Sequence, residues 1–291
     1  MRTSGQVAET GYNTTPAPSW AGVGTCALAD TELALPHPAP LRLDYHLMAL
    51  VTAGQGEVEI DFRTYECRPG TLLWVEPGQA LRFGGRPGLD AAMVTWRDDV
   101  LTDEVSPSTS TQLTGADEDA MISEFAQLAE DCDRLDPGPI AAALLRHQLA
   151  VLLLRVALLT GGQGDTPPSA EARTFARFRA ALEDGHAESR RVEDYAARLG
   201  CSVRTLTRAS LAITGRTAKQ VVDDRVALEA RRLLACTAQS VAEVGRRLGF
   251  PEPTNFGRFF HREVGESPGA FRAAHTEQLN GRIPAQRPPS D

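Results

Sequence analysis

At 291 residues, the chain is long enough for two domains of ordinary size. Because 42% of the residues are apolar, it can bury real cores and does not belong to the disordered class. No apolar run reaches the ~20 residues of a membrane helix, and no secretory signal is evident, so we expect no membrane association. The cysteines show no close pairing, which fits packing residues in a reducing cytoplasm: Cys26, Cys67, Cys132, Cys201 and Cys236.

The net charge of −8 averages over two unlike halves of the chain. Residues 1–170 carry −13 and residues 171–291 carry +5. Such asymmetry indicates a nucleic-acid-binding module joined to a domain of another kind. Arginine supplies 29 of the 30 basic residues, and its fork binds phosphates and guanine edges well. A GC-rich genome that favours arginine codons explains this bias equally well.

The first half of the chain predicts a flexible arm followed by a β-domain. Residues 1–25 are polar and interrupted by Pro and Gly, which is typical of a mobile arm. Further on, alternating apolar residues indicate strands separated by Gly and Pro turns. These apolar positions are Leu41, Leu43, Tyr45, Leu47, Val58, Ile60 and Phe62, followed by Leu72 to Val75 and Ala91 to Trp96. We therefore expect a small antiparallel barrel or jelly roll over residues 26–116.

Helical periodicity follows and predicts two helices, over residues 118–133 and 139–160. The second helix is rich in apolar residues: Ile140, Leu144, Leu145, Leu149, Leu152, Leu153, Val156 and Leu159. That much leucine suits a helix packed on its own domain and on a partner subunit, so residues 117–160 are predicted to form the helical dimerisation segment of a homodimer. A Gly/Pro linker is expected over residues 161–171, and a loose Pro-rich tail over residues 277–291.

Residues 192–217 and 241–267 resemble each other, at an offset of 49 residues before a turn and 50 after it. Each segment predicts a short helix, a Gly-centred turn and a second helix, which is the plan of a helix-turn-helix. Ala196 and Gly245 occupy matching positions where small residues let two helices cross closely. An amphipathic helix from about 218 to 236 joins the two units. It spans roughly 28 Å, comparable with the ~34 Å between successive major grooves on one face of DNA.

The second helix of each unit divides into a core face and an outer face. In the first unit Ser202 is predicted to cap this helix, and in the second unit Pro253 suits the first helical position. The residues expected in the core are Leu206, Ala209 and Ile213, and then Phe256, Phe259, Phe260 and Val264. The candidate DNA contacts are Arg204, Thr205, Thr207 and Arg208, and then Thr254, Asn255 and Arg258. Gly215 and Gly265 are expected to end the two helices.

Residues 175–275 resemble the DNA-binding region of the AraC/XylS family. The matching stretches are Val192 to Gly215, Ala230 to Leu234, Ser240 to Phe250, Asn255 to Gly265 and Pro268 to Phe271. The resemblance implies a sequence-specific transcriptional regulator whose all-α domain, residues 172–276, inserts two recognition helices into adjacent major grooves of double-stranded DNA. RNA polymerase is expected as a further partner. Two positions depart from the family pattern, because Pro251-Glu252-Pro253 replaces the usual Ser cap and Gly245 replaces the common Ala.

The β-rich part resembles, more weakly, the cupin-like sensor domains that precede this DNA-binding region. The matching stretches are Arg68 to Leu73, Pro77-Gly78-Gln79 and Arg82-Phe83. The whole chain is thus predicted to be α+β, with a cupin-like barrel and helical segment before an all-α domain of two helix-turn-helix units and a linker helix.

A metal-binding cupin needs clustered His and carboxylate ligands. His46 has no second histidine two residues away, and Leu81 stands where a His commonly follows the Pro-Gly turn. We therefore predict no metal, no cofactor and no catalytic residue. The barrel is interpreted as a metal-free domain for a small-molecule effector or for subunit contacts, and a pocket for the effector has four candidate lining residues: Arg42, His46, Trp74 and Trp96.

Three other interpretations stay open. The chain could be a cupin-type metalloenzyme fused to a helical interaction domain. It could be a redox sensor using Cys26 or Cys67, which would need a thiol of depressed pKa. Residues 172–276 could form a helical protein-interaction domain, with Arg208 and Arg258 as solvated surface. The sequence identifies neither the effector, nor the target promoters, nor the sign of regulation.

Overall fold

The computed structural model describes residues 20–34, 39–84, 88–100, 108–159 and 169–277. These residues form two compact units, and the chain divides between Gly164 and Asp165. Much of the predicted arm, linker and tail lies outside the described residues: 1–19, 160–168 and 278–291.

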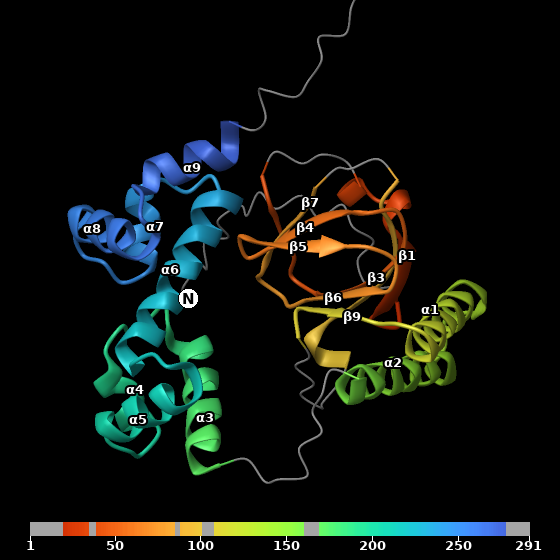
Figure 1. Cartoon of the computed structure of the whole chain (residues 1–291), viewed down its shortest axis with the longest axis horizontal. Coiled ribbons are helices and arrows are strands. Elements are labelled where there is room, and N and C mark those ends of the chain that lie inside the picture. Colours follow the sequence, from red (N-terminus) through yellow and green to blue (C-terminus); the bar gives the residue numbers. More distant parts are fainter. Residues whose placement is uncertain (1–19, 35–38, 85–87, 101–107, 160–168, 278–291) are drawn as a thin grey trace, which may run out of the picture. The chain divides into compact units, whose positions relative to one another are not determined.

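The N-terminal unit is built on two antiparallel sheets (Figure 1). One sheet has the strand order β1-β8-β3-β6-β9 and the other has the order β2-β7-β4-β5. Their bounds are β1 Val23–Ala27, β2 Leu41–Arg42, β3 His46–Ala53, β4 Gly56–Ile60, β5 Arg63–Cys67, β6 Thr71–Val75, β7 Ala80–Phe83, β8 Asp90–Trp96 and β9 Ser110–Gln112. The predicted antiparallel β-domain is confirmed. Short 3-10 helices span Leu28–Asp30, Glu32–Ala34 and Asp98–Val100.

Alternation along β3 separates two hydrophobic cores. Leu47, Ala49 and Val51 join a cluster with residues of both sheets, including Val58 and Leu81. The alternate residues of β3, Met48 and Leu50, join a second cluster that the five-stranded sheet shares with two helices. Side chains on successive strand residues point to opposite faces, so one sheet serves both cores.

Two details of the predicted β-domain are wrong. The sequence predicts a mobile arm to residue 25, but β1 begins at Val23 and pairs with β8. Ala21 and Val23 are fully buried, because these apolar residues fill the edge of the helix-facing core. Phe62 lies in the turn between β4 and β5 and not in a strand. Asp61 and Phe62 have φ values of 51° and 63°, as a two-residue hairpin turn requires.

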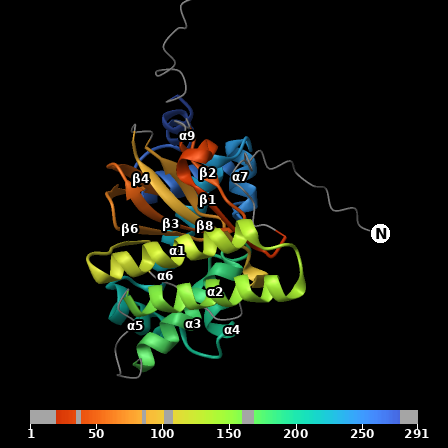
Figure 2. The same cartoon turned by 90° about the vertical axis from the view of Figure 1, so that its right-hand side faces the viewer.

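Helices α1 (Ala116–Arg134) and α2 (Pro139–Leu159) lie side by side against the five-stranded sheet (Figure 2). Their buried residues include Met121, Phe125 and Leu128 in α1, and Leu145, Leu149, Leu152, Leu153 and Val156 in α2. The buried Asp131 carboxylate accepts hydrogen bonds from Gln148 Nε2 at 2.6 Å and Gln127 Nε2 at 3.0 Å. These bonds lower the pKa of Asp131, so this carboxylate joins the helices in its charged form.

By length and composition, α2 is the helix within the described ranges that could cross a membrane. Arg146, His147 and Gln148 interrupt the apolar run of this helix, so the sequence predicts no membrane helix here. The inner face of α2 packs on the sheet and on α1, and Arg155 Nη1 lies 2.9 Å from Glu124 Oε1 of α1. Helices in the cores of soluble proteins share this composition.

The described part of the C-terminal unit is helical (Figure 1). Its elements are α3 Ala170–Gly185, α4 Val192–Arg198, α5 Val203–Thr214, α6 Ala218–Cys236, α7 Val241–Arg247, α8 Pro253–Val264 and α9 Pro268–Glu277. The predicted linker extends to residue 171, but α3 already begins at Ala170. Ser169 Oγ accepts a hydrogen bond from the Ala172 N–H at 3.0 Å and so caps the helix two residues earlier than the composition suggested.

Candidate nucleic-acid interface

The first helix-turn-helix unit consists of α4 and α5. Gly200 adopts a φ of 65° in the turn between them, a conformation that glycine adopts without steric cost. Ser202 Oγ accepts a hydrogen bond from the Thr205 N–H at 3.1 Å and caps α5. Gly215, with a φ of 70°, ends the helix.

The faces of α5 agree with the expected division at all but one position. Leu206 and Ala209 are buried, Arg204 and Arg208 are exposed, and Thr205 and Thr207 are half-buried. The prediction that Ile213 faces the core is wrong, because its side chain is 46% exposed. Instead Ser210 is buried and donates a hydrogen bond to the Leu206 carbonyl at 2.8 Å. The neighbouring helices cover α5 only as far as this residue, since residues 211–216 are all exposed.

The second unit, α7 and α8, is built in the same way with other residues. Ser240 and Glu243 form a capping box at the start of α7, and Pro253 begins α8. Phe256, Phe259 and Phe260 are buried, whereas Val264, expected in the same stripe, is half-buried. The three candidate DNA contacts of α8 are exposed: Thr254, Asn255 and Arg258.

Helix α6 connects the two units, and its bounds confirm the predicted connector. The apolar stripe of this helix is buried: Val222, Val226, Ala230, Leu233 and Leu234. Thr217 and Gln220 form a capping box at its start. The Glu229 side chain is 7% exposed, and its Oε2 lies 3.2 Å from Arg225 Nη1 and 3.6 Å from Arg232 Nη1. Both arginine side chains are also largely buried. Arg225 Nε also lies 2.7 Å from Glu183 Oε2, which joins α6 to α3.

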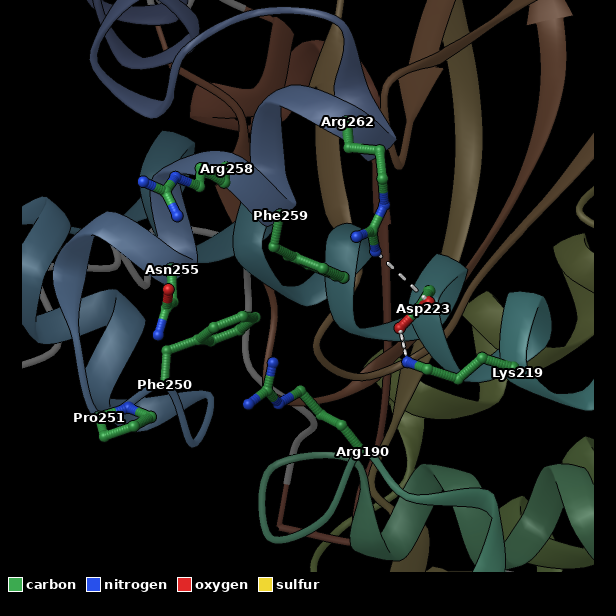
Figure 3. Close-up of a pocket in the computed structure, with 9 residues that line it drawn as sticks. All are labelled: Arg190, Lys219, Asp223, Phe250, Pro251, Asn255, Arg258, Phe259 and Arg262. Atoms are coloured by element: carbon green, nitrogen blue, oxygen red, sulfur yellow. Dashed lines mark hydrogen bonds and ion pairs between the residues drawn. The ribbon is translucent and has the colours of Figure 1, made fainter.

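A basic groove of about 390 Å³ lies beside α8 (Figure 3). Nine residues line it: Arg190, Lys219, Asp223, Phe250, Pro251, Asn255, Arg258, Phe259 and Arg262. Asp223 is the carboxylate among these lining residues. It pairs with Lys219, and its Oδ2 lies 3.6 Å from Arg262 Nη2. Arg262 also pairs with Glu263 at 2.6 Å. Cations thus outnumber the carboxylate in this groove, which suits a polyanion.

Two lining residues of this groove, Asn255 and Arg258, are among the contacts predicted from the sequence, but four charged residues are not: Arg190, Lys219, Asp223 and Arg262. Arg262 follows Arg258 by four residues, so helical periodicity alone could have found it. Arg190 and Lys219 come from distant parts of the sequence, and the tertiary fold alone brings them to α8.

Arg208, the expected contact residue of α5, pairs with α3. Its Nε lies 3.5 Å from Glu171 Oε1, although the Arg208 side chain is 71% exposed. An exposed pair of this kind contributes little stability, so a DNA ligand can displace it at small cost.

The four residues expected to line an effector pocket do not all meet. His46 stacks on Trp96, with ring centroids 5.0 Å apart, and Trp74 lies edge-on to Trp96 at 5.1 Å. Both tryptophans belong to the core under α1 and α2 and not to the core shared by the two sheets. Arg42 lies in the other sheet, where its Nε donates to the Gly78 carbonyl at 2.8 Å.

Cys26 and Cys67 lack the depressed thiol pKa that a redox sensor requires. Burial raises the pKa of Cys26 to about 11, and the nearby Asp30 charge adds to this shift. Burial likewise raises the pKa of Cys67 to about 11. Both thiols stay protonated at neutral pH, so the redox-sensor interpretation is wrong in its premise. Among the described residues, no group of three or more His, Cys, Asp or Glu side chains is arranged to hold a metal ion.

Comparison with known proteins agrees with this architecture. Residues 27–154 match the family model described as an AraC-like ligand binding domain, and residues 195–274 match a helix-turn-helix domain model. The chain belongs to the AraC family of transcriptional regulators. It is therefore a DNA-binding regulator with an N-terminal ligand-binding domain, and the metalloenzyme interpretation is set aside.

Relatives of this AraC-family chain include the HTH-type transcriptional activator RhaS of Salmonella typhimurium. It is 27% identical over 251 residues, which cover 79% of this chain and 85% of RhaS. ToxT from Vibrio cholerae O395 is similar over 89% of this chain and 98% of its own, at 9% identity and a TM-score of 0.45. The DNA-binding domain of AdpA, solved in complex with a target DNA, covers 37% of this chain and 97% of its own, at 37% identity and a TM-score of 0.34.

Proposed function

We propose that this AraC-family regulator reads DNA by placing α5 and α8 in adjacent major grooves. The observation that carries this proposal is that two helices with exposed polar faces, α5 and α8, are joined by a 19-residue helix of roughly 28 Å. That length is comparable with the ~34 Å between successive major grooves. The residues proposed to contact DNA are Arg204, Thr205, Thr207 and Arg208 of α5, and Thr254, Asn255 and Arg258 of α8.

The basic groove supports a further part of this interface. Lys219 at the start of α6 and Arg262 in the last turn of α8 both line this groove, and their side chains are 56% and 63% exposed. Cationic groups beside a recognition helix bind backbone phosphates and fix its orientation without reading bases. We assign this role to Lys219 and Arg262, and leave base reading to the exposed face of α8.

DNA binding by a fragment of residues 165–291 tests the proposal. DNA sequences that bind the fragment are selected from a random-sequence pool, and the selected sites are footprinted with the bound fragment. We expect two protected half-sites about one helical turn apart, with affinity that falls steeply as salt rises. Protection of one half-site alone, or binding insensitive to salt, would exclude two-groove reading.

We also propose that the protein is a homodimer joined through α2. Five apolar side chains on the outer face of this helix are exposed: Ile140, Leu144, Val151, Leu154 and Leu158. With His147 they occupy alternating steps of three and four residues, the a and d positions of a heptad repeat. A stripe of this spacing fits the same stripe of a second copy, as in a two-helix coiled coil. Sedimentation at tens of micromolar checks this: a monomer with and without DNA would exclude it.

A small-molecule effector is proposed for the N-terminal unit, close to His46, Trp74 and Trp96. Trp74 is buried, and its Nε1–H meets no hydrogen-bond acceptor among the residues that the structure describes. A buried donor of this kind costs free energy unless a ligand or water satisfies it. Candidate effectors are screened by quenching of tryptophan fluorescence. If the quenching were the same in Trp74→Phe as in the wild type, an effector site beside Trp74 would be excluded.

Cytoplasmic localisation and contact with RNA polymerase complete the proposal. Five free cysteines fit a reducing compartment such as the cytoplasm. Fractionation of cells that express the protein tests the first point. Transcription in vitro with purified RNA polymerase tests the second and gives the sign of regulation.

A further inference from the structure

Arg190 links the two helix-turn-helix units. It lies just before α4 of the first unit, but its guanidinium lies against the second unit (Figure 3). Its Cζ is 3.6 Å from the centroid of the Phe250 ring, and its Nη2 donates a hydrogen bond to the Gly249 carbonyl at 3.1 Å. Gly249 and Phe250 lie in the turn between α7 and α8. One side chain therefore bridges residues 59 positions apart.

The backbone around Arg190 is anchored to the first unit. The preceding residue, Ser189, accepts a hydrogen bond from the Tyr195 hydroxyl at its carbonyl, at 2.7 Å. Its own hydroxyl donates to Asp194 Oδ2 at 2.5 Å and accepts the Arg191 N–H at 3.1 Å. Tyr195 is buried within α4, so the base of the Arg190 side chain moves with α4.

The far end of the link reaches recognition helix α8. Phe250 is 3% exposed, and its ring lies 5.4 Å from Phe256 and 5.0 Å from Phe259, measured between centroids. Both partners belong to the buried face of α8. A displacement of Phe250 would therefore also displace α8, the helix that carries Asn255 and Arg258.

We infer that Arg190 is a positioning residue that holds the two recognition helices at one separation, so that the protein discriminates between operators by the distance between their half-sites. The inference rests on the proposed two-groove reading of DNA. Helix α6 joins the units covalently, and the Arg190–Phe250 contact is a second link, between residues outside that helix, that opposes rotation of either unit about it. The planar Arg guanidinium stacks flat on a ring and donates a directed hydrogen bond at the same time, whereas the Lys ammonium is a point charge that cannot stack in this way.

Binding of the intact protein to a family of operators tests this inference. The operator is the sequence selected from a random-sequence pool by binding to the protein. Its derivatives carry one base pair inserted or deleted between the half-sites. Each insertion moves the half-sites apart by about 3.4 Å and rotates them about the duplex. Dissociation constants are measured for each operator and for each half-site alone, over a range of salt concentrations.

Two variants of Arg190 and one control separate the possible roles. We expect Arg190→Ala and Arg190→Lys to reduce the preference for the original spacing about three- to tenfold, as loss of one stacked cation and one hydrogen bond predicts. Because Arg190→Lys keeps the positive charge in the basic groove, the half-site affinities and the salt dependence of this variant should stay as in the wild type. Arg191→Ala is the matched control, because the Arg191 side chain is 75% exposed and pairs with Glu193 of its own helix. It should keep the full spacing preference.

Phe250→Leu gives an independent check. It removes the ring but keeps an apolar side chain, so it should relax the spacing preference and add little to the effect of Arg190→Ala. An unchanged spacing preference in both Arg190 variants would overturn the inference. Loss of binding to a single half-site would also overturn it, because Arg190 would then be needed for the structure of one helix-turn-helix unit and not for the separation of the two. A phosphate contact would be indicated instead if the salt dependence became shallower in Arg190→Ala and returned to the wild-type slope in Arg190→Lys. A wild type that binds only one half-site would defeat the proposed function itself.

Discussion

Gly245 of α7 lies directly against Phe256 of α8. A β-carbon on Gly245 would be 3.1 Å from the Phe256 Cβ and 3.2 Å from its Cγ, which is closer than normal van der Waals contact. Phe256 has no room to yield, because it is fully buried and its ring packs against Phe250 and Phe260. The departure from the family's usual alanine is therefore matched to a large aromatic residue in the facing helix.

We expect Gly245→Ala to destabilise the C-terminal unit. Alanine favours the helix by up to about 1 kcal/mol, but overpacking a buried contact costs about 1–3 kcal/mol. The net loss should be about 1 kcal/mol, measured as the free energy of unfolding in urea. Gly257→Ala is the matched control, because a β-carbon there meets nothing within 4 Å and should stabilise α8. Equal stabilisation by both changes would show that Phe256 can move aside.

Arg208 and Arg258 occupy equivalent places, two residues beyond Leu206 and Phe256. We expect each arginine to read a guanine through its O6 and N7 atoms, a contact worth roughly 1–3 kcal/mol of discrimination. Changing each to Ala should then relax selectivity at one base pair of the corresponding half-site. A uniform loss with a smaller salt slope would indicate a phosphate contact. Full affinity and selectivity in both variants would contradict the proposed docking.

Asp223 restrains the cations of the basic groove. We expect Asp223→Asn to release Lys219 and to strengthen DNA binding about two- to fivefold at low salt, with a steeper salt dependence, because one more cation reaches phosphate. Titrations at several salt concentrations measure both quantities. Asp224→Asn removes the same charge one residue away, where Asp224 pairs with Arg216, and should have the smaller effect. Equal effects of the two substitutions would show that the net charge of the protein, and not the position of Asp223 in the groove, determines the change in DNA affinity.

The exposed stripe on α2 predicts the behaviour of charged variants. Val151→Glu and Leu154→Glu should convert the dimer to a monomer, since each would place a carboxylate in an apolar helix pair. Both native side chains are exposed, so the thermal stability of the subunit should change little. Analytical ultracentrifugation gives the mass. Ala126→Glu, on the exposed face of α1, is the control and should leave the dimer intact.

The raised pKa values of Cys26 and Cys67, both about 11, predict slow alkylation by iodoacetamide at pH 7.5. The rate should increase as pH rises toward 11, because the thiolate is the reacting form. A folded pKa above the ordinary value of 9.0 also means that these thiols favour the folded state below pH 9. This contribution is lost as pH rises through the folded value. Rapid alkylation of Cys26 or Cys67 in the native protein at neutral pH, located by peptide mapping, would contradict the burial of these thiols.

The sequence by itself determined the two helix-turn-helix units, because their signals are local. Ser202 caps a helix through a residue three positions away, and Gly215 and Gly265 end helices through their own φ angles. A helical period and a turn glycine need no information about the rest of the chain. The connector α6 was predictable for the same reason.

Only the tertiary structure decided which residues surround those helices. Arg190 meets Phe250 because the fold brings together residues 60 positions apart in the chain, and no local pattern encodes that approach. The sequence predicts the strands that carry Trp74 and Trp96, but it could not say that α1 and α2 cover the face on which both tryptophans lie. Ile213 fits the helical stripe and is still exposed, because burial depends on where the neighbouring helices end.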